Sequence, residues 1–310
     1  MTLPKRPLEG CAINLSISES DDSSQRGFPG WQVNRTTLQI VAALFGQGTS
    51  VVFGHNWQED GVMEAVYGFA RQVQAPIPLS PENAAAESQP LLRNLLPWPD
   101  KPYLSVRDLE LLEATLKVEF VGLPKELEPF DDKGRRFEPD TVPYRYLRAR
   151  GLTLLRQRLN DVSHVRLCLG GRRSGYAGRY PGVIEEAFLA VTAEKPLYLA
   201  GFLGGATEQV INAIEGKQIT DDFCPPTSLQ DIYGAPPLKE LDQGTRDDRI
   251  IDRVSVWNTF AEAGPKQFAA SNGLTLEENT ELHHTPVIDR AIELVLIGLS
   301  RLRPAFAPLN

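Results

Sequence analysis

The chain has 310 residues, of which 42% are hydrophobic and 23% are charged, and its net charge at pH 7 is −8. This composition is typical of a globular protein with one large core or two modest ones, and it argues against a disordered chain. The negative charge argues against a duplex nucleic acid partner, because such binding needs a broad cationic surface.

The sequence also argues against membrane contact and against a disulfide framework. No apolar run approaches the roughly 18 residues of a membrane span, and the N-terminal residues lack the apolar core of a signal peptide, so we expect a cytoplasmic location. Three widely spaced cysteines, Cys11, Cys168 and Cys224, form neither disulfide nor zinc motifs.

The first part of the chain alternates predicted strands and helices. Alternating apolar residues predict a strand over 11–17, and a polar loop follows it. A helix is predicted over 35–45 with Asn34 as its N-cap. A buried strand over 50–53 then runs into a glycine turn, after which a second helix begins near Met63. This order is typical of a parallel sheet that is covered by helices.

A proline-rich segment interrupts this pattern. Seven prolines between Pro76 and Pro102 predict a loop, with a short strand over 91–96. Alternation predicts another strand over 116–121. We interpret residues 76–143 as an insertion in a domain that spans residues 1–220.

A second alternating unit follows the insertion. A helix that begins at Tyr144 or Gly151 and ends at Leu159 precedes a strand over 165–169. A helix over 184–193, a strand over 197–200 and a helix over 207–215 complete the unit, so the fold class is predicted to be α/β.

Residues 221–310 are predicted to form a helical C-terminal extension that packs on the same domain. A helix is expected over 251–263, and an amphipathic helix over 285–302 carries a stripe of aliphatic residues at helical spacing. A partner-binding helix would have the same pattern, but burial is the commoner fate of such a stripe.

Arginine is concentrated in one stretch of the sequence. Residues 145–179 contain nine arginines, no lysine and one acid, Asp161, which gives +8 and leaves −16 for the remaining chain. Guanidinium groups match phosphate oxygens in pairs, so the stretch is compatible with a small anionic ligand. On charge alone a solvated basic face is the commoner interpretation, and it is the glycine motifs inside the stretch that favour the ligand. We predict a phosphate site with Arg156, Arg172 and Arg179 nearest the ligand.

Glycine turns follow several of the predicted strands. The loop from Gly170 to Pro181 follows a strand and opens a helix, where glycines and unpaired amides can approach an anion closely. A long surface loop with glycine turns is the alternative. Because parallel strands end at the same sheet edge, we expect one cleft there. Its predicted lining is Ser18, Glu19, Gly54, His55, Gly171, Arg172, Gly182, Glu186 and Gly204.

Three segments of the sequence resemble motifs of the LOG-type phosphoribohydrolases, the lysine-decarboxylase-like enzymes. Gly54-His55 followed by Gly61 to Val66 resembles their GGG…GLMGAV turn and helix, and residues 181–186 resemble the end of their PGGxGTxxE motif. Residues 153–156 lie where that family has its HERK arginine. Together the segments resemble the SLOG superfamily of Rossmann-like nucleotide-binding domains over about Cys11 to Glu215.

The form of the glycine loop, GGxxSGYxGRxPGxxEEA over residues 170–187, resembles sensor-like SLOG branches that are associated with TIR, sirtuin-like or other defence effectors. The resemblance implies a Rossmann-like parallel sheet with helices on both faces. It also implies that Arg156 is the phosphate-side arginine, Glu186 the ribose-side glutamate and Gly182 the amide-presenting glycine.

This sequence departs from the hydrolase pattern at two motifs. The second glycine and the threonine of PGGxGTxxE are missing, and the GGG turn is reduced to Gly54-His55. Both changes remove phosphate-binding donors, which favours binding without catalysis.

The resemblance therefore implies a sensor for a small nucleotide-derived anion, ADP-ribose-like or a cyclic nucleotide, in bacterial defence or signalling. The alternative is a nucleoside 5′-monophosphate N-glycosidase with Arg156 and Glu186 as catalytic residues, and a scaffold with a vestigial pocket is a third reading. We expect a homo-oligomer, an effector partner such as a TIR protein, and no cofactor.

Two other chemistries are not predicted. His283 and His284 are adjacent and should point to different faces of a regular element, which makes them a poor metal pair, so no metal site is expected. A serine hydrolase is not expected either, because the sequence has no GxSxG elbow and Ser174 has no nearby histidine.

Overall fold

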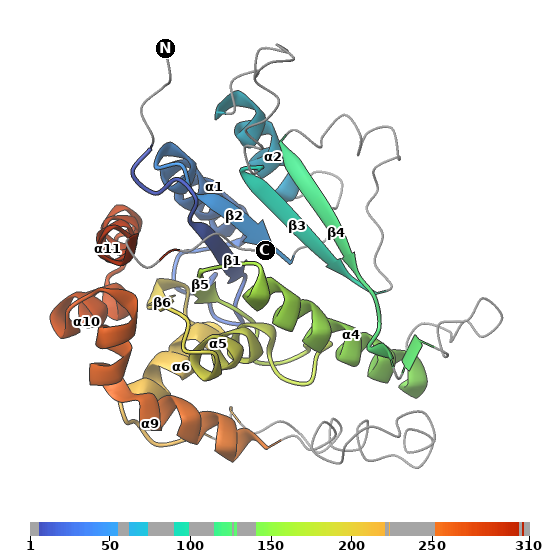
Figure 1. The fold of residues 1–310 in the computed structure, drawn as a ribbon. Coiled ribbons are helices and arrows are strands. Elements are labelled where there is room, and N and C mark those ends of the chain that lie inside the picture. Colours follow the sequence, from blue (N-terminus) through green and yellow to red (C-terminus); the bar gives the residue numbers. More distant parts are fainter. Residues whose placement is uncertain are drawn as a thin grey trace, which may run out of the picture.

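The computed structural model describes residues 6–54, 62–73, 90–98, 115–125, 127–128, 141–220, 223, 252–303 and 306. Its strands form a six-stranded sheet in the order β4-β3-β2-β1-β5-β6, and every neighbouring pair is parallel (Figure 1). The predicted α/β fold with a parallel sheet is therefore confirmed. The strands are β1 Ala12–Ser18, β2 Ser50–Phe53, β3 Leu92–Pro97, β4 Leu116–Val121, β5 Val165–Gly170 and β6 Leu197–Ala200.

Helices cover both faces of this sheet. Helices α1, α2 and α11 pack on one face, while α4, α5 and α6 pack on the other, with α9 lying outside α5 and α6 (Figure 1). The helices described are α1 Gly30–Gly46, α2 Val62–Val73, α4 Val142–Asp161, α5 Gly182–Thr192, α6 Gly205–Ile214, α9 Arg253–Asn272, α10 Leu276–His284 and α11 Ile288–Leu302, with a 3-10 turn, η3, over Gly201–Leu203.

The central strand β1 is buried on both faces, as expected of a parallel strand between two helical layers. Ile13, Leu15 and Ile17 belong to the core shared with α1 and α11. Because side chains alternate along a strand, Asn14 and Ser16 face the opposite helical layer. Two buried polar side chains of β1 therefore face the layer that contains α4 and α5.

Helix α1 starts one turn earlier than the sequence predicts. Its N-cap is Pro29 and not Asn34, and it begins at Gly30. The apolar stripe explains the earlier start, because Val33 is 4% exposed and continues the buried face of Ile40 and Leu44. The predicted strands over 50–53 and 197–200 agree with β2 and β6.

Two strands lie inside the range that the sequence suggests is an insertion. Strands β3 and β4 pair with each other over six residues, from Leu92 opposite Leu116 to Pro97 opposite Val121, and β3 also pairs with β2. This range therefore supplies one edge of the main sheet. Pro97 is the last residue of β3.

Helix α9 is longer than predicted and is kinked. It continues beyond Ala263 to Asn272, with non-helical backbone angles at Gly264 followed by Pro265. The proline has no N–H to donate and the glycine adopts a positive φ of 55°. This interruption explains why the sequence pattern stops near residue 263.

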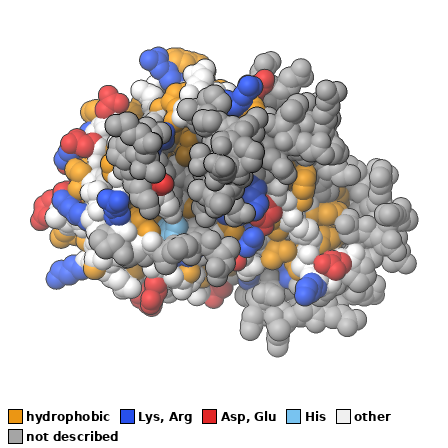
Figure 2. Space-filling view, turned by 45° about the horizontal axis from the view of Figure 1, so that its top comes forward, with side chains coloured by type: hydrophobic (Ala, Val, Ile, Leu, Met, Phe, Trp, Pro, Cys, Tyr) orange, Lys and Arg blue, Asp and Glu red, His pale blue; other side chains and the backbone are white. Residues whose placement is uncertain are grey.

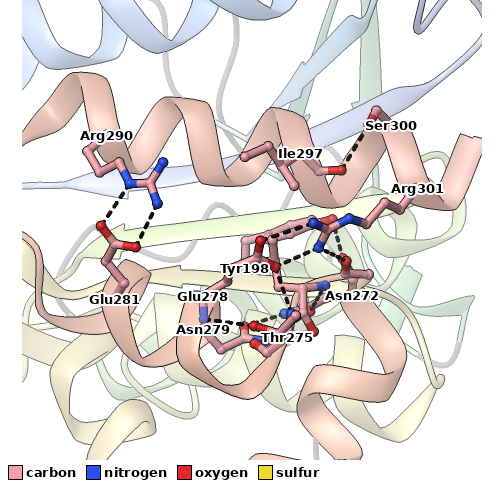
Figure 3. Close-up of polar contacts among 12 residues, drawn as sticks. Tyr198, Asn272, Thr275, Glu278, Asn279, Glu281, Arg290, Ile297, Ser300 and Arg301 are labelled. Carbon is pink, nitrogen blue, oxygen red and sulfur yellow. Dashed lines mark hydrogen bonds and ion pairs between the residues drawn. The ribbon is translucent and has the colours of Figure 1, made fainter.

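A buried polar cluster joins the C-terminal helices to the sheet (Figure 3). The Tyr198 hydroxyl on β6 donates to the Asn272 carbonyl at 2.6 Å, and the Asn272 side chain donates to the Leu197 carbonyl at 3.1 Å and to Asn279 at 2.7 Å. An ion pair of 2.6 Å between Arg301 and Glu278 links α11 to α10. The extension therefore packs on the main sheet through specific polar contacts as well as apolar ones.

The described surface shows no concentration of one charge on the face seen in Figure 2, where acidic and basic side chains are interspersed. Among the described residues, no helix is long and apolar enough to cross a membrane.

Candidate functional site

A cleft opens at the carboxyl ends of β1 and β5. Strand β1 pairs with β2 on one side and with β5 on the other, so the chain connections leave in opposite directions at this point. In open α/β sheets such a switch point is the usual position of a ligand site. The cleft has a volume of about 410 Å³, which is the size of a small-molecule site.

Six of the predicted ligand residues line this cleft although they come from distant parts of the sequence. They lie at the ends of β1, β2 and β5 or in the first five residues of α5, as expected at one edge of a parallel sheet. His55 lies outside the described residues. The six are Ser18, Gly54, Gly171, Arg172, Gly182 and Glu186.

Two other predicted residues lie away from the cleft lining. Glu19 is exposed, and its carboxylate lies against Gly30 at the start of α1. Arg179 is half-buried, with its guanidinium 5.3 Å from the centre of the Tyr180 ring.

The glycine turn at Gly204 does not line the cleft because a carboxylate already occupies the start of α6. The Gly205 amide donates to Asp22 at 3.1 Å, and Asp22 pairs with Arg26 at 2.7 Å. Burial alone would raise the pKa of Asp22, but hydrogen bonds from Arg26 and Ser20 bring the pKa below its usual value. Asp22 therefore supplies the negative charge that a ligand would bring to this helix start.

The start of α5, in contrast, is open to the cleft. Its N-cap is Pro181, which has no side-chain donor or acceptor, and no side chain of the described part of the chain caps this helix. Gly182 and Val183 both line the cleft. The unpaired first-turn amides and the positive end of the helix dipole can therefore meet an anion there.

Arg156 lies directly behind this helix start. A Cβ added at Gly182 would lie 3.0 Å from its guanidinium. Arg156 is 7% exposed and pairs with Glu185, while its Nε lies 3.7 Å from Glu186 Oε1. Glu185 also accepts a 2.6 Å hydrogen bond from Thr153. Arg156 thus acts on the cleft through its carboxylate partners and not by lining it.

Glu186 is held by a second arginine that site prediction missed. Arg166 on β5 donates to Glu186 Oε2 at 2.8 Å, to Asn14 at 2.9 Å and to Ser16 at 2.9 Å. Its side chain is 1% exposed. Asn14 stands opposite Arg166 in the strand register, so the polar residues that alternate with apolar ones in β1 are the signal that could have identified this cluster.

Two further lining residues, Arg148 and Tyr176, were not predicted. Arg148, Leu152 and Arg156 are spaced by four residues on α4 and so share one face of the helix. That spacing within the arginine-rich stretch could have identified Arg148.

The loop between β5 and α5 is tied to α9. The Tyr176 hydroxyl accepts a hydrogen bond from Arg253, whose guanidinium lies 5.7 Å from the centre of the same ring. The Asp252 amide donates to the Tyr180 hydroxyl at 3.3 Å. One wall of the cleft is therefore in direct contact with the first turn of a C-terminal helix.

Cys168 on β5 lies below the cleft but is not suited to nucleophilic chemistry. Burial raises the pKa of its thiol to about 12, so the thiol stays protonated at neutral pH.

One family model matches a range of the chain that includes the whole sheet and the cleft. A family model described as SLOG cluster2 matches residues 7–282. Comparison with curated proteins and with solved structures finds no match.

Proposed function

The chain belongs to the SLOG cluster2 family, and we propose that its cleft binds a small nucleotide-derived anion as the input of a sensor. Membership of this family indicates sensing of nucleotide-derived ligands in general. The observation that carries the proposal for this chain is the uncapped start of α5, which faces the cleft beside the exposed Arg172.

The ligand class that we propose is ADP-ribose-like or a cyclic nucleotide. The start of α5 would take a phosphate, because its amides and dipole favour an anion. Arg148 and Arg172 bring further positive charge to the lining, and Glu186 would accept hydrogen bonds from ribose hydroxyls. Arg172 has no ion pair or hydrogen bond to any described residue, so its guanidinium is available to the ligand.

The contacts of Glu186 favour binding over hydrolysis. A general base needs a carboxylate oxygen that can reach the reacting atom. Oε2 of Glu186 already accepts from Ser16 and Arg166, and Oε1 lies beside Arg156. A carboxylate held in this way is suited to orienting a ribose.

The loop that carries Tyr176 gives the sensor a route for its output. A ligand that moves Tyr176 changes the hydrogen bond to Arg253 and with it the first turn of α9. We propose that the C-terminal helices pass this change to an effector protein, of the TIR type or another.

A thermal-shift panel tests the proposal. Ligands that bind only the folded state raise the melting temperature in proportion to RT ln(1 + [L]/Kd). We expect ADP-ribose, a cyclic nucleotide or a close relative to raise the melting temperature in a saturable manner. If nucleosides without phosphate act as well as the phosphorylated compounds, the anion site is wrong.

Removing Arg172 should weaken this binding. Loss of one charge-assisted contact costs about 1.5 to 3 kcal/mol, which is roughly one to two decades in Kd. Isothermal titration of Arg172→Ala with the nucleotide of highest affinity measures the loss. Arg303→Ala, an exposed arginine near the end of the last helix, removes the same charge and should leave Kd unchanged. Equal affinities of the wild type and Arg172→Ala would contradict the prediction.

Incubation with nucleoside monophosphates, NAD and ADP-ribose should release no free base. Chromatography of the mixture measures this directly. Release at an ordinary enzymatic rate, on the order of 1 per second, would favour the N-glycosidase instead. In that case Glu186→Gln should abolish the release.

A further inference from the structure

Three side chains that can bind a metal meet where α6 ends against the last turn of α10. Glu215 is the residue after the end of α6, and His283 and His284 are the last two residues of α10. His283 Nδ1 lies 3.3 Å and His284 Nε2 lies 2.7 Å from the same oxygen, Oε1 of Glu215.

The two histidines reach one oxygen although they are neighbours in sequence. His283 is 5% exposed and uses the ring nitrogen near its backbone, whereas His284 is exposed and uses the far one. This difference in reach compensates for the helical rotation between the two residues. The sequence-based expectation that their side chains point to different faces does not account for this difference.

We propose that Glu215, His283 and His284 bind one divalent transition-metal ion of the zinc type. Two imidazoles and one carboxylate are a usual protein ligand set for zinc. Magnesium and calcium prefer oxygen ligands throughout, so this set disfavours them.

The ligand atoms of the three residues need to move only a short way to surround a zinc ion. Around a tetrahedral zinc ion, ligand atoms at zinc distances of roughly 2.0–2.2 Å stand about 3.3 Å from one another. The ligand atoms of the three residues lie within 4.8 Å of one another. His284 is free to close the widest of these separations because it is exposed.

His283 is positioned by its surroundings to accept a metal. Its ring packs edge-on against Phe268 at 6.0 Å between centroids, which fixes the direction of Nδ1.

One neighbouring charge opposes the ion and supplies a control. Lys217 lies 3.2 Å from the other oxygen of Glu215, Oε2. This ammonium group would repel a divalent cation at the site, so we expect Lys217→Ala to bind the metal more tightly than the wild type.

Isothermal titration of the full chain, stripped with a chelator, tests the site with ZnCl₂ as the probe. We expect one saturable site, no binding of MgCl₂ under the same conditions, and an increase in melting temperature with zinc. Cobalt(II) provides a second readout, since its visible absorption reports nitrogen and oxygen ligation in a tetrahedral site.

His284→Ala and Glu215→Gln each remove a ligand and should weaken zinc binding by about 100-fold or more. His284 is exposed, so the variant should keep the metal-free melting temperature of the wild type. Glu277→Gln removes an exposed carboxylate from the same helix and should leave zinc binding unchanged. Absence of a saturable site, or unchanged affinity in His284→Ala, overturns the proposal. The nucleotide panel is independent of these measurements.

Discussion

Glu186→Ala is expected to lower the free energy of unfolding by about 3 kcal/mol, because it leaves the buried guanidinium of Arg166 without its carboxylate. Arg166 is 1% exposed, whereas 16% of the Glu186 side chain is exposed to the cleft. Water that enters from the cleft can solvate part of the remaining charge, which is why we expect the lower end of the usual range for a broken buried pair.

Urea unfolding of the two proteins measures this loss. The double variant Arg166→Met/Glu186→Leu removes both charges and should recover most of the stability, since an apolar pair can replace a buried ion pair. Glu277→Ala, at an exposed position, should change the unfolding free energy by less than about 0.5 kcal/mol. If Glu186→Ala were as stable as this control, the ion-pair cluster would not be a stabilising feature of the site.

Gly170→Ala should destabilise the protein by about 3 to 4 kcal/mol, through a strained backbone and an atomic overlap together. Gly170 has a φ of 62°, and an added Cβ would lie 2.3 Å from the Ser18 carbonyl oxygen. Backbone at both positions is fixed by the sheet pairing of β1 with β5.

Gly175→Ala is the matched control for this substitution. Gly175 has nearly the same φ, 63°, but nothing lies within 4 Å of an added Cβ. Gly175→Ala should lower the free energy of unfolding by about 1 kcal/mol, which is the cost of the positive φ alone. Equal losses of stability in the two variants, measured by urea unfolding, would show that the close approach of β1 and β5 is not as described.

The alternation of strand and helix patterns in the sequence predicts a parallel sheet, but not all of its strands. Strand β2 is a short apolar run and β6 follows a helical pattern, and both were located from those signals. Strands β3 and β4 were also detected, but their place in the sheet was not, because strand pairing depends on contacts far apart in sequence. Prolines in that range obscured its contribution to the sheet edge.

The candidate site was predictable where it depends on backbone position. Gly54, Gly171 and Gly182 line the cleft because the carboxyl ends of parallel strands converge. Gly204 does not, since Asp22 fills the start of α6, and sequence spacing carries no information about a carboxylate from another loop. Arg156 and Arg166 have the same charge in the sequence as the other arginines of the stretch, and only packing shows that they are buried.

The central claim is that a ligand binds in the cleft at the carboxyl ends of β1 and β5. Amide hydrogen exchange tests it directly, with and without the nucleotide that gives the largest increase in melting temperature. We predict slower exchange at residues 170–186, and a smaller effect in the first turn of α9 through the contact of Tyr176 with Arg253. A second hollow lies between α1 and α11 and is lined by Gln39, Ala43, Ile292 and Leu296 among others. Slower exchange confined to that hollow, with residues 170–186 unchanged, would contradict the account.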